Sequence, residues 1–146
     1  MEKGVIMLKV LFFLIVNFIP ADDFFGGLEG IPKAENSLES RVNDRIQYAV
    51  MENNRGAHYS ALASLRAAVN ETSFKSAKAR YFLARQYQMM DANGLESRNG
   101  QSFVEGMKLH FTQSTKLGNT NLDSFPSNAI YAKKSVARLN QMNLDR

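Results

Sequence analysis

Hydrophobic residues recur at helical spacing from residue 37 onward. In the first such stretch, Leu38, Val42, Ile46 and Ala49 stand four, four and three residues apart, which places them on one face of a helix. The segment ENNRG at 52–56 combines asparagines with a glycine, residues that commonly end a helix. The pattern therefore predicts an amphipathic helix that begins at about residue 37 and stops within that segment.

The same periodicity predicts four further helices, at about 57–70, 74–90, 102–117 and 128–142. The connections between them are short, except for the polar loop at 91–101, which contains two Asn-Gly pairs. Short connections make neighbouring helices run antiparallel. Since no run of residues reads as a strand, we predict an all-α fold of antiparallel helix pairs.

Two sequence signals mark the ends of the fourth helix. Ser102 followed by Glu105 has the pattern of a capping box, in which the two side chains bond each other's backbone N–H groups. Gly118 stands where a helix-ending glycine is expected. We therefore expect this helix to begin after Ser102 and to end at Gly118.

The first residues differ in character from the rest of the chain. A start that carries Lys3 and Lys9 leads into the ten-residue apolar run 10–19, and Pro20 and Ala21 follow it. Such a basic start, short apolar run and small final residue are typical of a secretory signal peptide. We expect cleavage after Ala21; the open alternatives are an uncleaved membrane anchor and a buried core helix.

These features divide the chain into three parts. We expect a signal peptide at 1–21, a flexible linker at 22–36 and one α-helical domain at 37–146. The linker carries three glycines and a proline, which is typical of a connection rather than a regular element. Export would place the domain in the periplasm or outside the cell.

A pattern of small and large residues also recurs in the predicted helices. Ala49 and Ala84 stand about one repeat length apart, each in the first helix of a pair. The positions after Ala49 carry a glycine at the turn and then a small, a large and a small residue: Gly56, Ala61, Leu65 and Ala68. This spacing resembles that of a tetratricopeptide repeat.

The second helix pair continues the resemblance. Leu83, Ala84 and Tyr87 give the L-A-x-x-Y form of the motif, and the segment 106–119 is similar to the Sel-one-like variant. That segment carries an aromatic pair, two small residues and a glycine: His110, Phe111, Ser114, Thr115 and Gly118. The resemblance implies a short solenoid of two helix pairs, with the helix at 128–142 as a C-terminal capping helix.

The chain departs from the repeat pattern at three positions. Glu52 stands where an aromatic residue is usual, Met107 where alanine is usual, and Ser73 where a proline closes the first unit. A plain bundle of alanine-rich helices is therefore the alternative architecture.

Composition narrows the possible functions. The chain has 146 residues and no cysteine, which excludes disulfides, thiolate metal sites and cysteine catalysis. Its net charge is +4, but acidic residues are scattered among the basic ones, so nucleic-acid binding is not expected. His58 and His110 are the only histidines, and neither belongs to a metal-ligand motif. We therefore expect neither a metal nor a cofactor.

Motifs of catalysis are missing as well. The sequence has no GxSxG elbow and no phosphate-binding loop. Paired carboxylates can lie far apart in a chain, so spacing does not identify them, and Glu52, Glu71 and Glu105 resemble ordinary helix-end acids. We expect a protein that is not an enzyme; a small exported hydrolase acting on cell-wall glycan is the alternative.

The repeat resemblance implies a binding surface for a protein or peptide. In that family the first helix of each pair lines a concave groove. The matching positions give these partner-binding residues: Asn43, Ile46, Val50, Asn53, Asn54, Lys78, Tyr81, Arg85, Gln88 and Met89. The two cations in this set suit an acidic segment of a partner. We interpret Lys133, Lys134 and Arg138 on the last helix as a solvated face.

Together these patterns predict an exported small helical repeat protein that mediates protein or peptide binding, as an adaptor, chaperone or assembly factor. If the N-terminal segment stays uncleaved, the alternative is a membrane-tethered structural helical protein.

Overall fold

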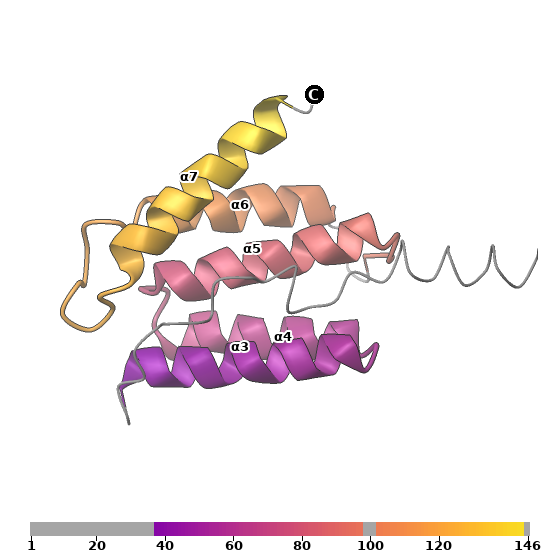
Figure 1. The fold of residues 1–146 in the computed structure, drawn as a ribbon, viewed down its shortest axis with the longest axis horizontal. Helices are drawn as coiled ribbons and strands as arrows, with labels where there is room; N and C mark the ends of the chain where they lie inside the picture. Colours follow the sequence, from indigo (N-terminus) through magenta and orange to yellow (C-terminus); the bar gives the residue numbers. More distant parts are fainter. Residues whose placement is uncertain (1–36, 98–101, 145–146) are drawn as a thin grey trace, which may run out of the picture.

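A computed structural model of the chain describes residues 37–97 and 102–144. The expected signal peptide and linker lie outside these residues. The described residues form five helices and no strand: α3 (Leu38–Asn54), α4 (His58–Glu71), α5 (Ala77–Ala92), α6 (Phe103–Thr115) and α7 (Asn128–Leu144). The predicted all-α class is confirmed (Figure 1).

The first helix pair follows the sequence signals closely. The Ser37 hydroxyl accepts a hydrogen bond from the backbone N–H of Ser40 at 3.0 Å, which caps α3. The turn into α4 passes through Gly56 at a φ of +82°, a conformation that glycine adopts without steric cost. Val42, Ile46 and Ala49 are buried as the spacing predicted, whereas Leu38 is 37% exposed.

The third helix starts three residues later than its hydrophobic pattern predicted. Ser73 and Phe74 take left-handed φ values of 51° and 64°, which no helix can include. Ser76 then caps α5, because its hydroxyl accepts from the backbone N–H of Ala79 at 3.0 Å. Phe74 therefore belongs to the turn between the helix pairs, where its side chain is 55% exposed.

The fourth helix begins as expected and ends earlier than expected. The Ser102 hydroxyl caps α6 by accepting from the N–H of Val104 at 3.2 Å, rather than from Glu105 as in a capping box. The helix ends at Thr115, and the φ of Gly118 is not positive. A β-carbon at Gly118 would lie 3.0 Å from the Cβ of Ala132. The glycine is therefore needed for a close approach to α7 and not for ending a helix.

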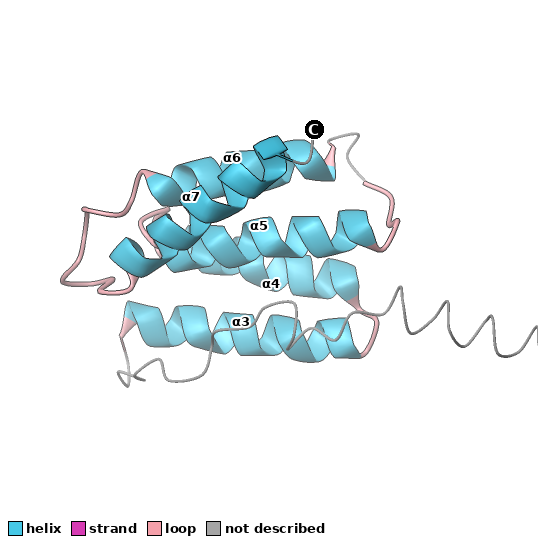
Figure 2. Ribbon diagram, turned by 45° about the horizontal axis from the view of Figure 1, so that its top comes forward, coloured by secondary structure: helices cyan, strands magenta, loops and turns pink. Residues whose placement is uncertain are grey.

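α5 is the central helix of the molecule. It packs against α4, α6 and α7, and more lightly against α3, while α3 packs mainly against α4 and α6 packs against α7. Figure 1 shows α5 between the pair α3 and α4 on one side and the pair α6 and α7 on the other, with α4 behind α3 and α6 behind α7. Figure 2 shows α5 between the same two pairs from a second direction. Between Ala77 and Met90 only Arg80 and Gln88 are not buried.

An aromatic cluster joins α5 to α6 and α7. The ring of Tyr81 lies with its centroid 5.3 Å from Phe82, 5.7 Å from Phe111 and 5.4 Å from Tyr131. Tilted and edge-to-face pairs of this kind contribute about 0.5–1.5 kcal/mol each beyond their buried area. This cluster fixes α7 against the second helix pair.

The same cluster sets the rotation of α7 about its axis. Apolar spacing predicts that Ala129, Ala132, Val136 and Leu139 face the core. Ala132 is buried, and Ala129 and Leu139 are half-buried, but the side chain of Val136 is 46% exposed. Tyr131 and Ser135 are buried in its place, and Tyr131 enters the aromatic cluster. Within the described residues, no helix is both long and apolar enough to cross a membrane.

Candidate binding face on helices α3, α5 and α7

A buried lysine joins α3, α5 and α7 near their N-terminal ends. Lys78 is 0% exposed, and its ammonium donates a hydrogen bond to the Oδ1 atom of Asn43. The same nitrogen lies 5.5 Å from the centroid of the Tyr131 ring, a cation–π distance. Burial lowers the pKa of Lys78 to about 8, although the carboxylate of Glu39 opposes the shift. Lys78 therefore connects three helices inside the protein.

The carboxylate of Glu39 ties the start of α3 to the start of α7. Glu39 is buried, and its Oε1 atom accepts from the backbone N–H of Ser127 at 3.0 Å and from the Ser127 hydroxyl. Ser127 immediately precedes α7, so the negative charge lies at the positive end of that helix dipole. This contact brings together residues that are 88 positions apart.

A pair of amides connects the far end of α3 to α5. Asn53 Nδ2 donates to Gln86 Oε1 at 2.7 Å, and Gln86 Nε2 donates back to Asn53 Oδ1 at 3.0 Å. Gln86 Nε2 also donates to the carbonyl of His58 at 3.1 Å. The Nδ1–H of His58 donates to Asn53 Oδ1 at 3.0 Å, and burial lowers the pKa of this histidine. The oxygen and the nitrogen of both side-chain amides thus have hydrogen-bond partners inside the fold.

Most of the residues predicted to bind a partner are buried where the helices meet. Asn43 and Lys78 are brought together by their hydrogen bond, Asn53 pairs with Gln86, and Ile46 lies in the core. The set divides by exposure as follows: Asn43, Ile46, Asn53, Lys78, Tyr81, Arg85 and Met89 are buried, Val50 and Gln88 are half-buried, and Asn54 is exposed. Their contact with a partner stays a prediction.

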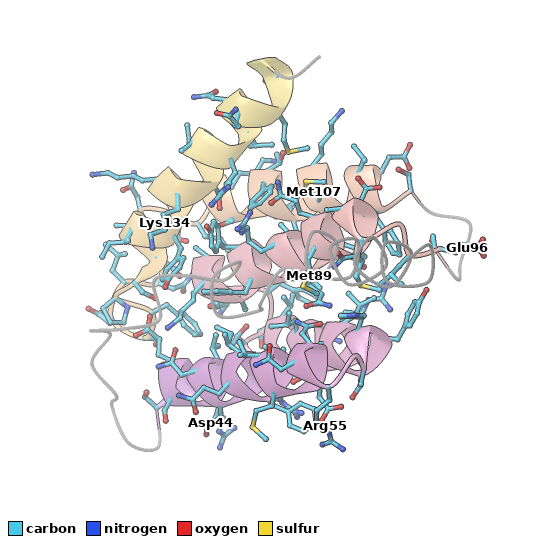
Figure 3. All side chains as sticks on the ribbon, turned by 45° about the vertical axis from the view of Figure 1, so that its right-hand side comes forward. Asp44, Arg55, Met89, Glu96, Met107 and Lys134 are labelled. Atoms are coloured by element: carbon cyan, nitrogen blue, oxygen red, sulfur yellow. The ribbon has the colours of Figure 1, made fainter. Side chains whose placement is uncertain are left out.

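A hollow opens on the same face, between α5 and α7. It has a volume of about 460 Å³ and is lined by Tyr81 of α5 and by four residues of α7: Lys134, Ala137, Arg138 and Gln141. The ammonium of Lys134 lies 4.9 Å from the centroid of the Tyr131 ring. Figure 3 labels Lys134 on α7 and Met89 on α5.

The hollow is rich in positive charge. Lys134 and Arg138 line it, and none of the described residues that line it is acidic. Burial, and then the nearby charge of Arg138, lowers the pKa of Arg85 to about 10. Sequence reasoning interpreted Lys134 and Arg138 as a solvated face, yet both side chains are half-buried. Their four-residue spacing, one turn of helix, was the signal that could have placed them together.

A second hollow lies between α3 and α4. It has a volume of about 510 Å³ and is lined by Arg41, Asp44, Arg45, Tyr48 and Glu71. Arg45 forms an ion pair with Glu71, and this bond lowers the pKa of the Glu71 carboxyl. A glycosidase needs one carboxyl whose pKa is raised so that it can donate a proton. The pKa of Glu71 is shifted in the opposite direction. The two acids of this hollow, Asp44 and Glu71, therefore do not favour glycan hydrolysis.

The opposite side of α5 carries a row of arginines and rings. Arg66 of α4 donates to the Tyr87 hydroxyl at 2.7 Å, and the Tyr87 ring stacks on His110 of α6 with planes 1° apart. His110 Nδ1 lies 2.8 Å from a guanidinium nitrogen of Arg80, which in turn lies over Phe74. Burial, Arg80 and Arg66 together lower the pKa of His110 to about 4. This histidine is therefore a neutral acceptor in the packing.

Metal-binding chemistry is not assembled in the part of the chain that the structure describes. No group of three or more His, Cys, Asp or Glu residues within 37–97 and 102–144 is arranged to hold an ion.

Comparison with known proteins leaves the family open. No protein-family model, curated protein or solved structure matches the chain.

Proposed function

We propose that the chain is an exported α-helical protein, not an enzyme, that binds a protein or peptide through the face of α3, α5 and α7. The observation that carries the proposal is the cation-lined hollow between α5 and α7. Tyr81, one of the residues predicted to bind a partner, forms part of its wall. Concave sites with a few converging polar groups are the usual places for ligand binding.

The order of the helices supports a repeat architecture for this face. α3, α5 and α7 meet through α5, whereas α4 and α6 lie behind them. Each helix packs mainly against its neighbours along the chain, as stacked antiparallel pairs do in solenoids. This arrangement supports a tetratricopeptide- or Sel-one-like short solenoid in which α7 serves as the capping helix.

Export rests on the N-terminal sequence and has a direct test. We expect N-terminal sequencing of the protein recovered from the periplasm or the medium to begin at Asp22. A protein that still starts at Met1 and stays with the membrane would support the membrane-tethered alternative instead.

Partner binding is tested by charge reversal at the hollow. Exported proteins captured on the immobilised chain would be compared with those captured on a Lys134→Glu, Arg138→Glu double variant. We expect a specific partner to be lost from the double variant and kept by a Lys133→Glu, Lys116→Glu control, since both control lysines are exposed and neither lines the hollow. Equal capture by all three proteins would argue against this face.

A further inference from the structure

Lys134 and Arg138 bring positive charge to the hollow between α5 and α7, and no carboxylate among the described residues forms an ion pair with either of them. The described ion pairs are Arg45 with Glu71 and Arg55 with Glu52, both remote from α7. Neither Lys134 nor Arg138 forms an ion pair with a residue that the structure describes. Both side chains line the hollow and are half-buried.

Each of these two cations also lies close to a second cation that is buried behind it. The charge of Lys134 contributes to lowering the pKa of Lys78, and the charge of Arg138 contributes to lowering that of Arg85. Like charges held this close repel one another, and an anion bound among them would relieve the repulsion. Lys134 and Arg138 both line the hollow, so its positive charge favours a negatively charged ligand, although the carboxylate of Glu39 offsets part of the charge of Lys78.

The walls of the hollow select among anions. Arg138 offers the forked donor geometry that suits a carboxylate or a phosphate, and Lys134 adds a single charge one turn away. Tyr81 and Ala137 contribute an aromatic and a methyl surface beside these charges. A free inorganic ion would leave that apolar surface uncovered, whereas the methylene groups of an acidic side chain would cover it.

From this geometry we infer that the hollow binds an acidic peptide segment, with a glutamate or aspartate carboxylate between Lys134 and Arg138 and its stem over Ala137 and Tyr81. This inference rests on the proposed function and names the chemistry of the partner. The segment lies along α7, and the small side chain of Ala137 leaves room for it between the two cations.

The inference is tested with two short peptides on the full chain. One peptide alternates glutamate with alanine, and the other has glutamine in place of each glutamate; binding is measured by fluorescence anisotropy at low and high salt. We expect the glutamate peptide to bind at least about tenfold more tightly, because each charged contact strengthens a hydrogen bond substantially. This preference shrinks as salt screens the charges.

Two variants test whether the glutamate peptide binds in the hollow. Lys134→Glu with Arg138→Glu abolishes the preference for glutamate, and Ala137→Phe weakens binding by filling the space without changing a charge. The Lys133→Glu, Lys116→Glu control retains the preference. Circular dichroism melting of each variant separates lost binding from lost folding, and Ala137 is exposed, so the phenylalanine is accommodated.

The possible outcomes separate the inference from the function on which it rests. Equal affinity for both peptides overturns the acidic-segment assignment, while a partner captured through this face would still support peptide binding. Displacement of the glutamate peptide by millimolar inorganic phosphate, with no effect of Ala137→Phe, overturns it in favour of a simple anion site. Loss of both peptide binding and partner capture overturns both proposals.

Discussion

At the scale of single residues, the most unusual feature is a lysine with no exposure to solvent. A buried ammonium loses its hydration, and one hydrogen bond to Asn43 and one ring face of Tyr131 replace only part of it. Residue type alone would place Lys78 at the surface. Its burial depends on partners from α3 and α7, and no local pattern in α5 reveals them.

We expect stability to rise with pH around the titration of Lys78. Its pKa is about 8 in the folded chain and 10.5 in a free lysine, so between these values the unfolded chain binds more protons. The free energy of unfolding should therefore increase by about 2 kcal/mol between pH 8 and pH 10. Lys78→Met should remove this increase while leaving stability at pH 7 nearly unchanged or higher. Urea unfolding across that range measures both effects.

The lowered pKa of the His110 imidazole predicts that the protein loses stability at acidic pH. Its pKa is about 4 in the folded chain against 6.5 for a free histidine, so the unfolded chain takes up more protons as the pH falls between these values. We expect a loss of about 2 kcal/mol from pH 7 to pH 5. His110→Gln keeps an acceptor for Arg80 and should flatten the profile, except for a part due to His58, whose pKa is lowered in the same direction. An unchanged profile in that variant would contradict the assignment.

At the scale of the helices, the sequence predicted where most elements begin and end, because caps and turns are local. The helix predicted from residue 37 begins at the Ser37 cap, and Gly56 makes the turn that ends it. Ser102 caps α6, although not in the pattern of the expected capping box. The start of α5 was missed because Phe74 takes a left-handed conformation that bulky residues rarely adopt. On α7 the burial of Ala132 was predicted correctly, but the exposure of Val136 and the burial of Tyr131 were missed because they depend on how Tyr131 packs against α5.

The approach of α6 to α7 can be tested at Gly118. A methyl group there would lie 3.0 Å from Ala132, so Gly118→Ala should lower the free energy of unfolding by about 1–3 kcal/mol through overpacking. Ala132→Gly removes the clashing methyl group but costs about 1 kcal/mol of helix propensity on its own. We expect the double variant to lose less stability than the sum of the single variants. Additive losses would show that the two positions are not in contact.

The residues that line the hollow were predicted only in part, because their positions also depend on how separate helices pack. The tyrosine at position 81 was predicted to bind a partner and does line the hollow. Lys134 and Arg138 were assigned to solvent, because periodicity does not show which polar positions of a terminal helix face its neighbour. That information comes from the crossing of α7 over α5, which the aromatic cluster determines.

At the scale of the whole molecule, the contact between Glu39 and Ser127 links the first described helix to the last. We expect Ser127→Ala to lower the free energy of unfolding by about 1–2 kcal/mol, since the buried carboxylate loses one of its donors. Hydrogen exchange should then accelerate first in the opening turn of α7. Ser124→Ala, at an exposed position of the same loop, is the control and should change neither quantity.

The paired amides of Asn53 and Gln86 have a consequence for how the helices find their alignment during folding. Two complementary hydrogen bonds form only when α5 lies at one longitudinal position along α3. Sliding by a single residue would leave both amides buried without partners, at a cost of about 1–3 kcal/mol for each unmatched group. Apolar surfaces of alanine and leucine tolerate several alignments of similar energy. The Asn53–Gln86 pair therefore selects one alignment of α5 along α3.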